Sequence, residues 1–234
     1  MSVDDCSSIT LQPIAWMRSP WTDKFGVPRQ PGLIPEAMGE VEFAKEYSDP
    51  EARAGLEGFT HLWVTFLFDK VAENAVRLRV RPPRLGGNEK KGVFATRSPF
   101  RPNRIGLSVC EIESVFPSLR VRGVDLVDGT PILDIRPYVP YVDSVPDASG
   151  GFANSEPVRI VVTVADIVKE QWDALPSEIQ RLLRGMISLQ PGPAYHEGTE
   201  RDYSATVNGW DVKWRMTGEE AQVFFLQENP LEED

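Results

Sequence analysis

The segment THLWVTFLF, residues 60–68, is the stretch that most directly indicates the fold. Aromatic and β-branched residues dominate it, and apolar side chains recur at every second position. One face of the expected strand carries only large apolar side chains: Leu62, Val64, Phe66 and Phe68. The opposite face carries His61, whose expected role is a structural hydrogen bond, since no neighbouring residue supports catalysis. We therefore expect a central β-strand here.

Short strand-like segments lie on both sides of this strand. They cover residues 10–16, 41–43, 76–80, 92–96, 105–112, 120–126, 132–135 and 158–164. Asp128-Gly129 predicts a hairpin between two of them. Regular alternation of strands and helices is absent, which favours a mainly β core, either a barrel or a sandwich, over a doubly wound sheet.

The pattern changes near residue 165. Apolar residues at helical spacing predict an amphipathic helix: Ile179, Leu182, Leu183, Met186 and Ile187. Asn208-Gly209 then predicts a hairpin between strands at 203–207 and 210–216, with a third strand at 223–226. We therefore expect two domains, a β domain over residues 1–165 and a small α+β C-terminal domain over residues 166–234.

Positive charge is concentrated in one segment of an acidic chain. Residues 77–104 hold nine Lys or Arg against one acid, although the formal net charge of the 234 residues is -10. A solvated strand face explains Arg77, Arg79 and Arg81 about as well as a binding surface does. Arg97, Arg101 and Arg104, by contrast, lie among prolines and glycines, and this favours the binding of an anion or a stacked base on one face.

The proline-rich segment 17–37 has two interpretations. It contains Arg29 and Gln30 between Pro28 and Pro31. Its spacing alone favours a plain connecting loop over a binding loop. The carboxylates Asp125, Asp128 and Asp134 invite an acid/base role, but a turn or an ion pair explains their spacing better.

Several chemistries have no sequence support. The chain has two histidines and two cysteines without a CxxC pair, so a metal site is not expected. The glycine fingerprints of dinucleotide and nucleoside triphosphate sites are missing, as is the GxSxG elbow. The N-terminus does not resemble a signal peptide and no apolar run could span a membrane, so a cytoplasmic protein is expected.

Five ordered motifs nevertheless resemble one family. They are KFGVPRQPGL, LEGFTHLWVTFLF, VRPPRLGGN, GVFATRSPFRPNRIGLS and VDLVDGTPILDIRPYVPY, supported near the C-terminus by PGPAYHEG and DVKWRM. Together they resemble the TrmO family, also called TsaA-like, which are S-adenosylmethionine-dependent tRNA methyltransferases. The resemblance implies methylation of N6 of N6-threonylcarbamoyladenosine, just 3′ of the anticodon. It also implies a small β-barrel that binds S-adenosylmethionine without a Rossmann fold, and a homodimer.

The resemblance also implies cosubstrate-binding residues. They are Pro28, Arg29, Gln30, Asp69, Lys70, Arg97, Leu107, Val127, Asp128, Gly129 and Thr130. Asp69-Lys70 replaces a His-Gln pair that is common in bacterial relatives, so only backbone contacts are expected to persist there. The expected tRNA phosphate contacts are Arg81, Arg84, Lys90, Lys91, Arg101 and Arg104. The sequence does not identify the catalytic base, and the reaction requires no metal.

Two alternatives stay open at this point. The departure at Asp69-Lys70 and the acidic net charge leave room for a non-catalytic module that binds RNA or senses S-adenosylmethionine. A methyltransferase acting on another small molecule is the weaker alternative, because it would not need the basic segment.

Overall fold

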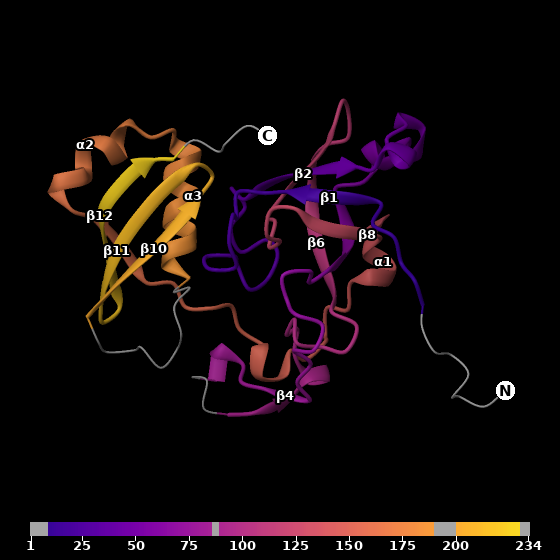
Figure 1. The fold of residues 1–234 in the computed structure, drawn as a ribbon, viewed down its shortest axis with the longest axis horizontal. Helices are drawn as coiled ribbons and strands as arrows, with labels where there is room; N and C mark the ends of the chain where they lie inside the picture. Colours follow the sequence, from indigo (N-terminus) through magenta and orange to yellow (C-terminus); the bar gives the residue numbers. More distant parts are fainter. Residues whose placement is uncertain (1–8, 86–88, 190–199, 230–234) are drawn as a thin grey trace.

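The computed structural model describes residues 9–85, 89–189 and 200–229, and in this part of the chain it is mainly β. The largest sheet contains β1 (Ala15–Arg18), β2 (Met38–Phe43), β3 (His61–Leu67), β6 (Ile105–Ser114), β7 (Leu119–Arg122) and β8 (Thr130–Pro137). Its order, β1-β2-β7-β6-β3-β8, closes on itself because β8 also pairs with β1. We call it the closed sheet, and it lies on the right in Figure 1.

The predicted central strand is confirmed as β3. It lies between β6 and β8, and its residues alternate between buried and half-buried positions. Leu62 and Val64 are fully buried inside the closed sheet. Closing the sheet around these apolar side chains removes them from water, which is why the alternating sequence pattern selects this strand.

Gly106 leaves the space that the Phe66 ring fills. The two residues are paired across β6 and β3. A Cβ atom at position 106 would lie 2.8 Å from Phe66 Cε1 and closer still to other ring atoms. The absence of a side chain at Gly106 is therefore a packing requirement of the closed sheet.

Replacing Gly106 with alanine is expected to lower the free energy of unfolding by about 1–3 kcal/mol, because the Phe66 ring must move. Chemical denaturation measures this change. Gly92→Ala is the matched control, because nothing lies within 4 Å of a Cβ atom at position 92. An additional Phe66→Leu change should restore part of the loss, and equal stability of Gly106→Ala and Gly92→Ala would contradict the packing argument.

A second, four-stranded sheet lies in the C-terminal part of the chain. It contains β9 (Val161–Val164), β10 (Arg201–Val207), β11 (Trp210–Thr217) and β12 (Glu220–Glu228), in the order β10-β11-β12-β9. Helices α2 (Asp166–Ala174) and α3 (Ser177–Ser188) lie against it. The predicted helix and the predicted Asn-Gly hairpin are confirmed as α3 and β10–β11, and both Asn208 and Gly209 have positive φ.

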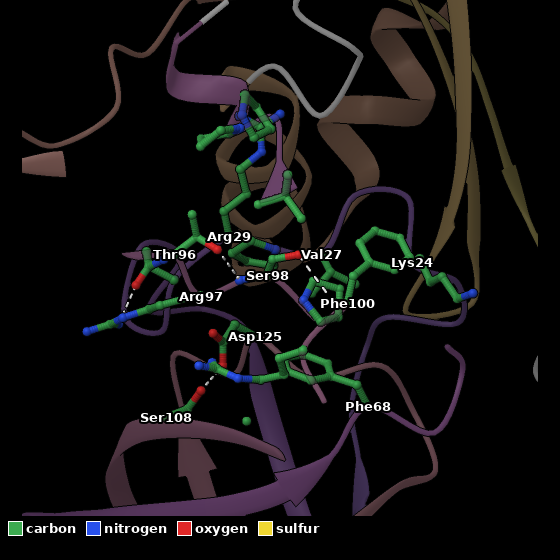
Figure 2. Close-up of a pocket in the computed structure, with 18 of the residues that line it drawn as sticks. Lys24, Val27, Arg29, Phe68, Thr96, Arg97, Ser98, Phe100, Ser108 and Asp125 are labelled. Carbon is green, nitrogen blue, oxygen red and sulfur yellow. Dashed lines mark hydrogen bonds between the residues drawn. The ribbon is translucent and has the colours of Figure 1, made fainter. Parts of the chain in front are cut away.

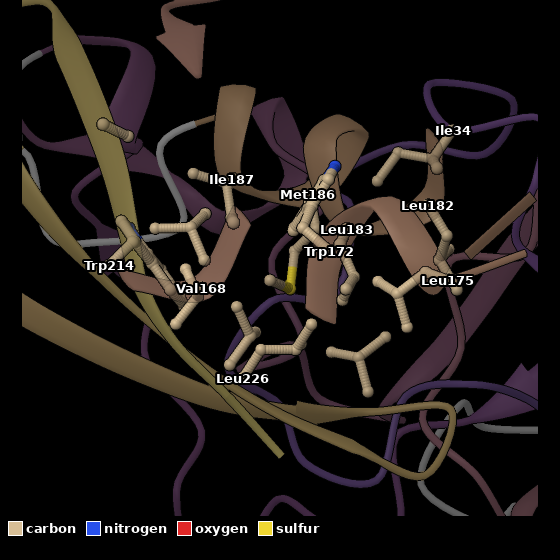
Figure 3. Close-up of a cluster of buried hydrophobic side chains, with 14 of the residues drawn as sticks. Ile34, Val168, Trp172, Leu175, Leu182, Leu183, Met186, Ile187, Trp214 and Leu226 are labelled. Atoms are coloured by element: carbon tan, nitrogen blue, oxygen red, sulfur yellow. The ribbon is translucent and has the colours of Figure 1, made fainter. Parts of the chain in front are cut away.

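The core between these helices and the second sheet is built from large side chains. Trp172, Leu183, Met186 and Trp214 are almost completely buried there (Figure 3). Ile34, from the proline-rich segment, packs into the same core. The two sheets are therefore joined by packing as well as by the chain.

Trp21 makes a second connection between the two sheets. Its ring is buried in the C-terminal core, and its Nε1 donates a hydrogen bond to the carbonyl of Val124 at 2.8 Å. An isolated bridge also pairs Trp21 with Val207 of β10. The segment that the sequence favours as a plain loop thus fixes the closed sheet against the second sheet.

The remaining elements are short. They are β4 (Arg79–Val80), β5 (Lys91–Gly92), α1 (Pro140–Asp143) and the 3-10 helices η2 (Lys45–Tyr47), η3 (Pro50–Arg53), η4 (Leu56–Gly58), η5 (Pro83–Leu85), η6 (Val93–Ala95) and η7 (Gly151–Ala153). β4 and β5 pair only with each other. The basic segment is therefore held mainly by turns, and it lies below the closed sheet in Figure 1.

Three sequence expectations need correction. The strand expected at 92–96 is wrong, because residues 93–95 form the 3-10 helix η6 after the two-residue strand β5. The hairpin at Asp128-Gly129 is wrong: β7 pairs with β2 and β6, whereas β8 pairs with β1 and β3. Only the local turn forms, with Gly129 at φ 74°. In addition, β9 precedes the expected boundary at residue 165 but pairs in parallel with β12, so this strand belongs to the second sheet.

Candidate functional site

A large cavity lies beside one end of β3 and β6, between the closed sheet, the C-terminal end of α3 and the basic segment. Its volume is about 1460 Å³. Residues from the proline-rich segment line it, as do residues from 68–71, 77–83, 94–101, 105–108 and 125–130. Met186 and Leu189 from the end of α3 also reach it. The cavity is larger than the usual range for a single small ligand, about 300–1,000 Å³.

Nine of the eleven expected cosubstrate residues line this cavity. They are Pro28, Arg29, Gln30, Asp69, Lys70, Arg97, Leu107, Val127 and Thr130. Arg29, Arg97 and Asp125 come together around it from three different segments (Figure 2). The fold therefore brings together residues that are up to about a hundred positions apart in the sequence.

Arg97 connects the basic segment to the proline-rich segment. Its Nη1 donates a hydrogen bond to Oε1 of Gln30. The preceding turn is fixed by Thr96, whose hydroxyl donates to the carbonyl of Val93 at 2.8 Å. This contact orients the Arg97 guanidinium at the cavity, where it can bind a carboxylate.

Asp69 and Lys70 form an ion pair at the other side of the cavity. Lys70 Nζ lies 3.4 Å from Asp69 Oδ2, and both side chains are partly exposed. Lys24 Nζ donates to the Lys70 carbonyl, and the Asp69 amide donates to the Leu67 carbonyl at 2.8 Å. The pair contributes a nearly neutral wall, so it does not repel a positively charged ligand.

Asp128 and Gly129 are the two expected cosubstrate residues that do not line the cavity. The Asp128 carboxylate accepts a hydrogen bond from the Ser19 amide at 2.9 Å and lies 3.6 Å from Arg18 Nη1. The Gly129 amide donates to the Met17 carbonyl at 2.8 Å. These contacts hold the turn at residues 128–129 against β1. The next residue, Thr130, lines the cavity again.

The expected phosphate-binding residues separate into two groups. Arg81, Lys90 and Arg101 line the cavity rim, where Phe94 is 76% exposed. Lys91 is instead paired with Glu89. The side chain of Arg84 lies outside the described part of the structure.

Arg104 has a structural role that the sequence does not reveal. Its Nη1 donates to the Val71 carbonyl at 2.7 Å, its Nη2 lies 3.2 Å from Glu73 Oε1, and its side chain is 17% exposed. Its backbone has a positive φ of 51°. Arg104 thus closes the turn after β3, and the expectation of a phosphate contact there is not supported by its geometry.

Asp125 and Ser108 both line the cavity, and neither has a firm role in the sequence analysis. Ser108, on β6, is 2% exposed, and its hydroxyl donates to Asp125 Oδ1 at 2.7 Å (Figure 2). Burial raises the pKa of Asp125 from its usual 3.8 to about 6, although the Ser108 hydrogen bond and the Arg97 charge act in the opposite direction. A carboxylate in this state is a proton acceptor that works near neutral pH.

This pKa predicts a pH-dependent stability difference between the protein and its Asp125→Asn variant. Between pH 3.8 and about 6 the folded state holds a proton that the unfolded state has lost. The free energy of unfolding therefore falls as the pH rises through this window, by up to about 3 kcal/mol. Asparagine does not titrate, so Asp125→Asn should gain relative stability from pH 4 to pH 7 in denaturant titrations. A difference independent of pH would contradict the raised pKa.

The cavity offers groups of the kind that S-adenosylmethionine, the cosubstrate expected from the TrmO resemblance, would need. Arg29 and Arg97 carry guanidinium groups that can bind a carboxylate, and Phe68 and Leu107 give apolar surface. Within residues 9–85, 89–189 and 200–229 no group of three His, Cys, Asp or Glu residues could hold a metal ion. In the same part of the chain, no helix combines the length and the apolar character needed to cross a membrane.

Comparison with known proteins agrees with this geometry. Residues 16–144 match the tRNA-methyltransferase O N-terminal domain, and residues 155–229 match the TrmO C-terminal domain. The chain is 42% identical over 232 residues to the tRNA (adenine(37)-N6)-methyltransferase of Escherichia coli K12, covering 94% of this chain and 99% of that protein. It is 40% identical over 141 residues to an S-adenosyl-L-methionine-binding protein of Archaeoglobus fulgidus, covering 60% of this chain and 96% of that protein.

A solved structure gives the same result for the fold. The crystal structure of TrmO from Pseudomonas aeruginosa superimposes with a TM-score of 0.78 at 34% sequence identity, covering 95% of this chain and 100% of that one. Two family domains, similarity over nearly the whole chain and a matching fold lead to one assignment. The chain belongs to the TrmO family.

Proposed function

We propose that this protein transfers a methyl group from S-adenosylmethionine to N6 of the adenosine at tRNA position 37. The similarity to the Escherichia coli tRNA (adenine(37)-N6)-methyltransferase over almost the full length carries the proposal. The acceptor expected from the TrmO resemblance is N6-threonylcarbamoyladenosine. The cavity has room for both the cosubstrate and the acceptor nucleoside, because its volume of about 1460 Å³ exceeds what one small ligand needs.

The closed sheet is proposed as the S-adenosylmethionine-binding unit, without a Rossmann fold. When bound, the cosubstrate supplies a methyl group on a sulfonium, and transfer is an in-line displacement at that carbon. Arg29 and Arg97 hold its carboxylate, and the Arg97–Gln30 contact fixes the loop on which Arg29 lies. Holding donor and acceptor in line lowers the entropic part of the barrier.

The rim of the cavity is the proposed RNA surface. Arg81, Lys90 and Arg101 supply positive charge for phosphates, and the exposed Phe94 ring supplies a surface on which a base can stack. A nucleotide turned out of the anticodon loop enters the cavity beside these residues. The local concentration of basic residues in the segment 77–104 accounts for RNA binding by a chain of net charge -10.

We further propose a cytoplasmic homodimer built from two domains, with the first domain carrying the cosubstrate and the second packed against it. An exposed apolar group near α1, formed by Tyr141, Val142 and Val145, is a suitable dimer contact. Light scattering on the purified protein tests the dimer. A monomer at micromolar concentration would contradict this part of the proposal.

The proposal is tested with S-adenosylmethionine that carries a radiolabelled methyl group. We expect label in tRNA from cells that lack the enzyme, and no label in tRNA that the enzyme has already modified. Calorimetry on the same preparation reports cosubstrate binding. Binding of S-adenosylmethionine without any transfer would contradict the enzymatic proposal and favour a non-catalytic sensing module.

A further inference from the structure

The acceptor nitrogen must lose a proton when it is methylated, and the cavity limits which group can take it. Among the described residues that line the cavity, the only carboxylates are Asp69 and Asp125. Lysine and arginine side chains offer hydrogen-bond donors when ionised, not acceptors. No histidine or tyrosine belongs to that described lining. The choice of a side-chain base therefore reduces to two aspartates.

Asp69 is the weaker of the two. Its Oδ2 lies 3.4 Å from Lys70 Nζ, so this carboxylate is already engaged in an ion pair. Asp125 is held differently. One of its oxygens accepts a hydrogen bond from the buried Ser108 hydroxyl, which fixes the plane of the carboxylate in the cavity wall. No other described side chain donates a hydrogen bond to Asp125, so apart from its own backbone amide the carboxylate is open to a substrate N–H.

We propose that Asp125 is the catalytic base that accepts the N6 proton of the adenosine during methyl transfer. The bond from N6 to the methyl carbon forms while the bond from that carbon to sulfur breaks, and the electron pair of the broken bond stays on sulfur. The N6 proton passes to the carboxylate of Asp125. The products are the methylated nucleoside, S-adenosylhomocysteine and a protonated Asp125, which returns its proton to solvent. This inference rests on the proposed function.

The surroundings of Asp125 suit this role. Burial raises its pKa to about 6, so the carboxylate is ionised at pH 7 to 8 but is a stronger base than an exposed aspartate. The charged group that acts on it is Arg97, and the titratable group that interacts with it from β6 is Cys110. Cys110 is fully buried, and burial raises the pKa of its thiol, so it stays neutral and does not compete for the proton.

The test is Asp125→Asn in the full-length protein, because asparagine has the same shape and still accepts the Ser108 hydrogen bond. If Asp125 is the general base, its replacement should lower kcat by about 100- to 10,000-fold. The KM for tRNA and the Kd for S-adenosylmethionine should change less than threefold. Asp134→Asn is the matched control, since Asp134 lies outside the cavity lining and is paired with Arg136 at 2.6 Å.

The pH profile separates a base from a merely structural carboxylate. The kcat/KM of the unsubstituted protein should rise with pH and level off above about 6; this rise is the acid limb of the profile. The acid limb should be absent from the profile of Asp125→Asn. Ser108→Ala should move the limb to higher pH, because the hydrogen bond that lowers the pKa is lost.

Three results would overturn the inference. They are a kcat for Asp125→Asn within threefold of the unsubstituted protein, a loss of cosubstrate affinity that matches the loss of activity, and an acid limb that persists in Asp125→Asn. An inactive unsubstituted protein would instead contradict the proposed function itself, and the inference with it. The two failures are therefore distinguished by the unsubstituted protein in the same assay.

Discussion

Arg97→Ala is expected to weaken S-adenosylmethionine binding by about 30- to 150-fold. The substitution removes the guanidinium from the cavity and the hydrogen bond that it donates to Gln30. A hydrogen bond to a charged group contributes about 1.5–3 kcal/mol, and the loss of loop order adds to it. Calorimetric titration with S-adenosylmethionine measures the effect directly.

Two further variants make this expectation specific. Arg97→Lys keeps the charge but not the planar fork, so we expect a smaller loss, of about tenfold. Arg136→Ala is the control, because Arg136 is an exposed arginine on β8 that does not line the cavity. Cosubstrate affinity of Arg97→Ala within threefold of the unsubstituted protein would remove Arg97 from the site.

A combined replacement of Arg81, Lys90 and Arg101 by alanine is expected to raise the KM for tRNA by about 10- to 100-fold at physiological salt. Each phosphate contact releases bound cations, so three lost contacts should reduce the slope of log affinity against log salt by about 2–3. Cosubstrate affinity should change little, because these residues lie at the rim. Filter binding over a series of salt concentrations gives the slope.

The matched control is a triple alanine replacement of Lys45, Arg120 and Lys169, which removes the same charge away from the cavity lining. It should alter the salt slope much less than the rim replacement. Equal slopes for the two triple variants would show that the net charge of the protein, and not the rim, governs tRNA binding.

Elements with a strong local signal could be predicted from the sequence. The alternation in β3 is decisive because one face is buried in the closed sheet. The stripe of α3 and the Asn208-Gly209 turn are similarly local signals. The turn at Asp128-Gly129 shows the limit of this approach. The dipeptide bends the chain, but β1 and β3 provide better partners for β8 than β7 does.

The candidate site also divides into features that the sequence predicts and features that only the structure shows. The resemblance to the TrmO family identifies the loops, and the structure brings nine of the eleven expected cosubstrate residues to one cavity. The resemblance could not reveal that the Arg104 side chain binds within its own turn, because that contact depends on the positive φ of Arg104 and on the Val71 carbonyl. The sequence names Asp125 beside Asp128 and Asp134 but could not choose among them, since the properties of Asp125 come from burial and from Ser108, seventeen residues earlier.

The measurement that tests the central claim most directly is nucleoside mass spectrometry after methyl transfer. Purified protein and S-adenosylmethionine are incubated with two tRNA pools, one that contains N6-threonylcarbamoyladenosine and one that lacks it. We predict a gain of one methyl group on that nucleoside alone, in the first pool only. A methyl group on another nucleoside, or no gain in either pool while S-adenosylmethionine binding is intact, would contradict the claim.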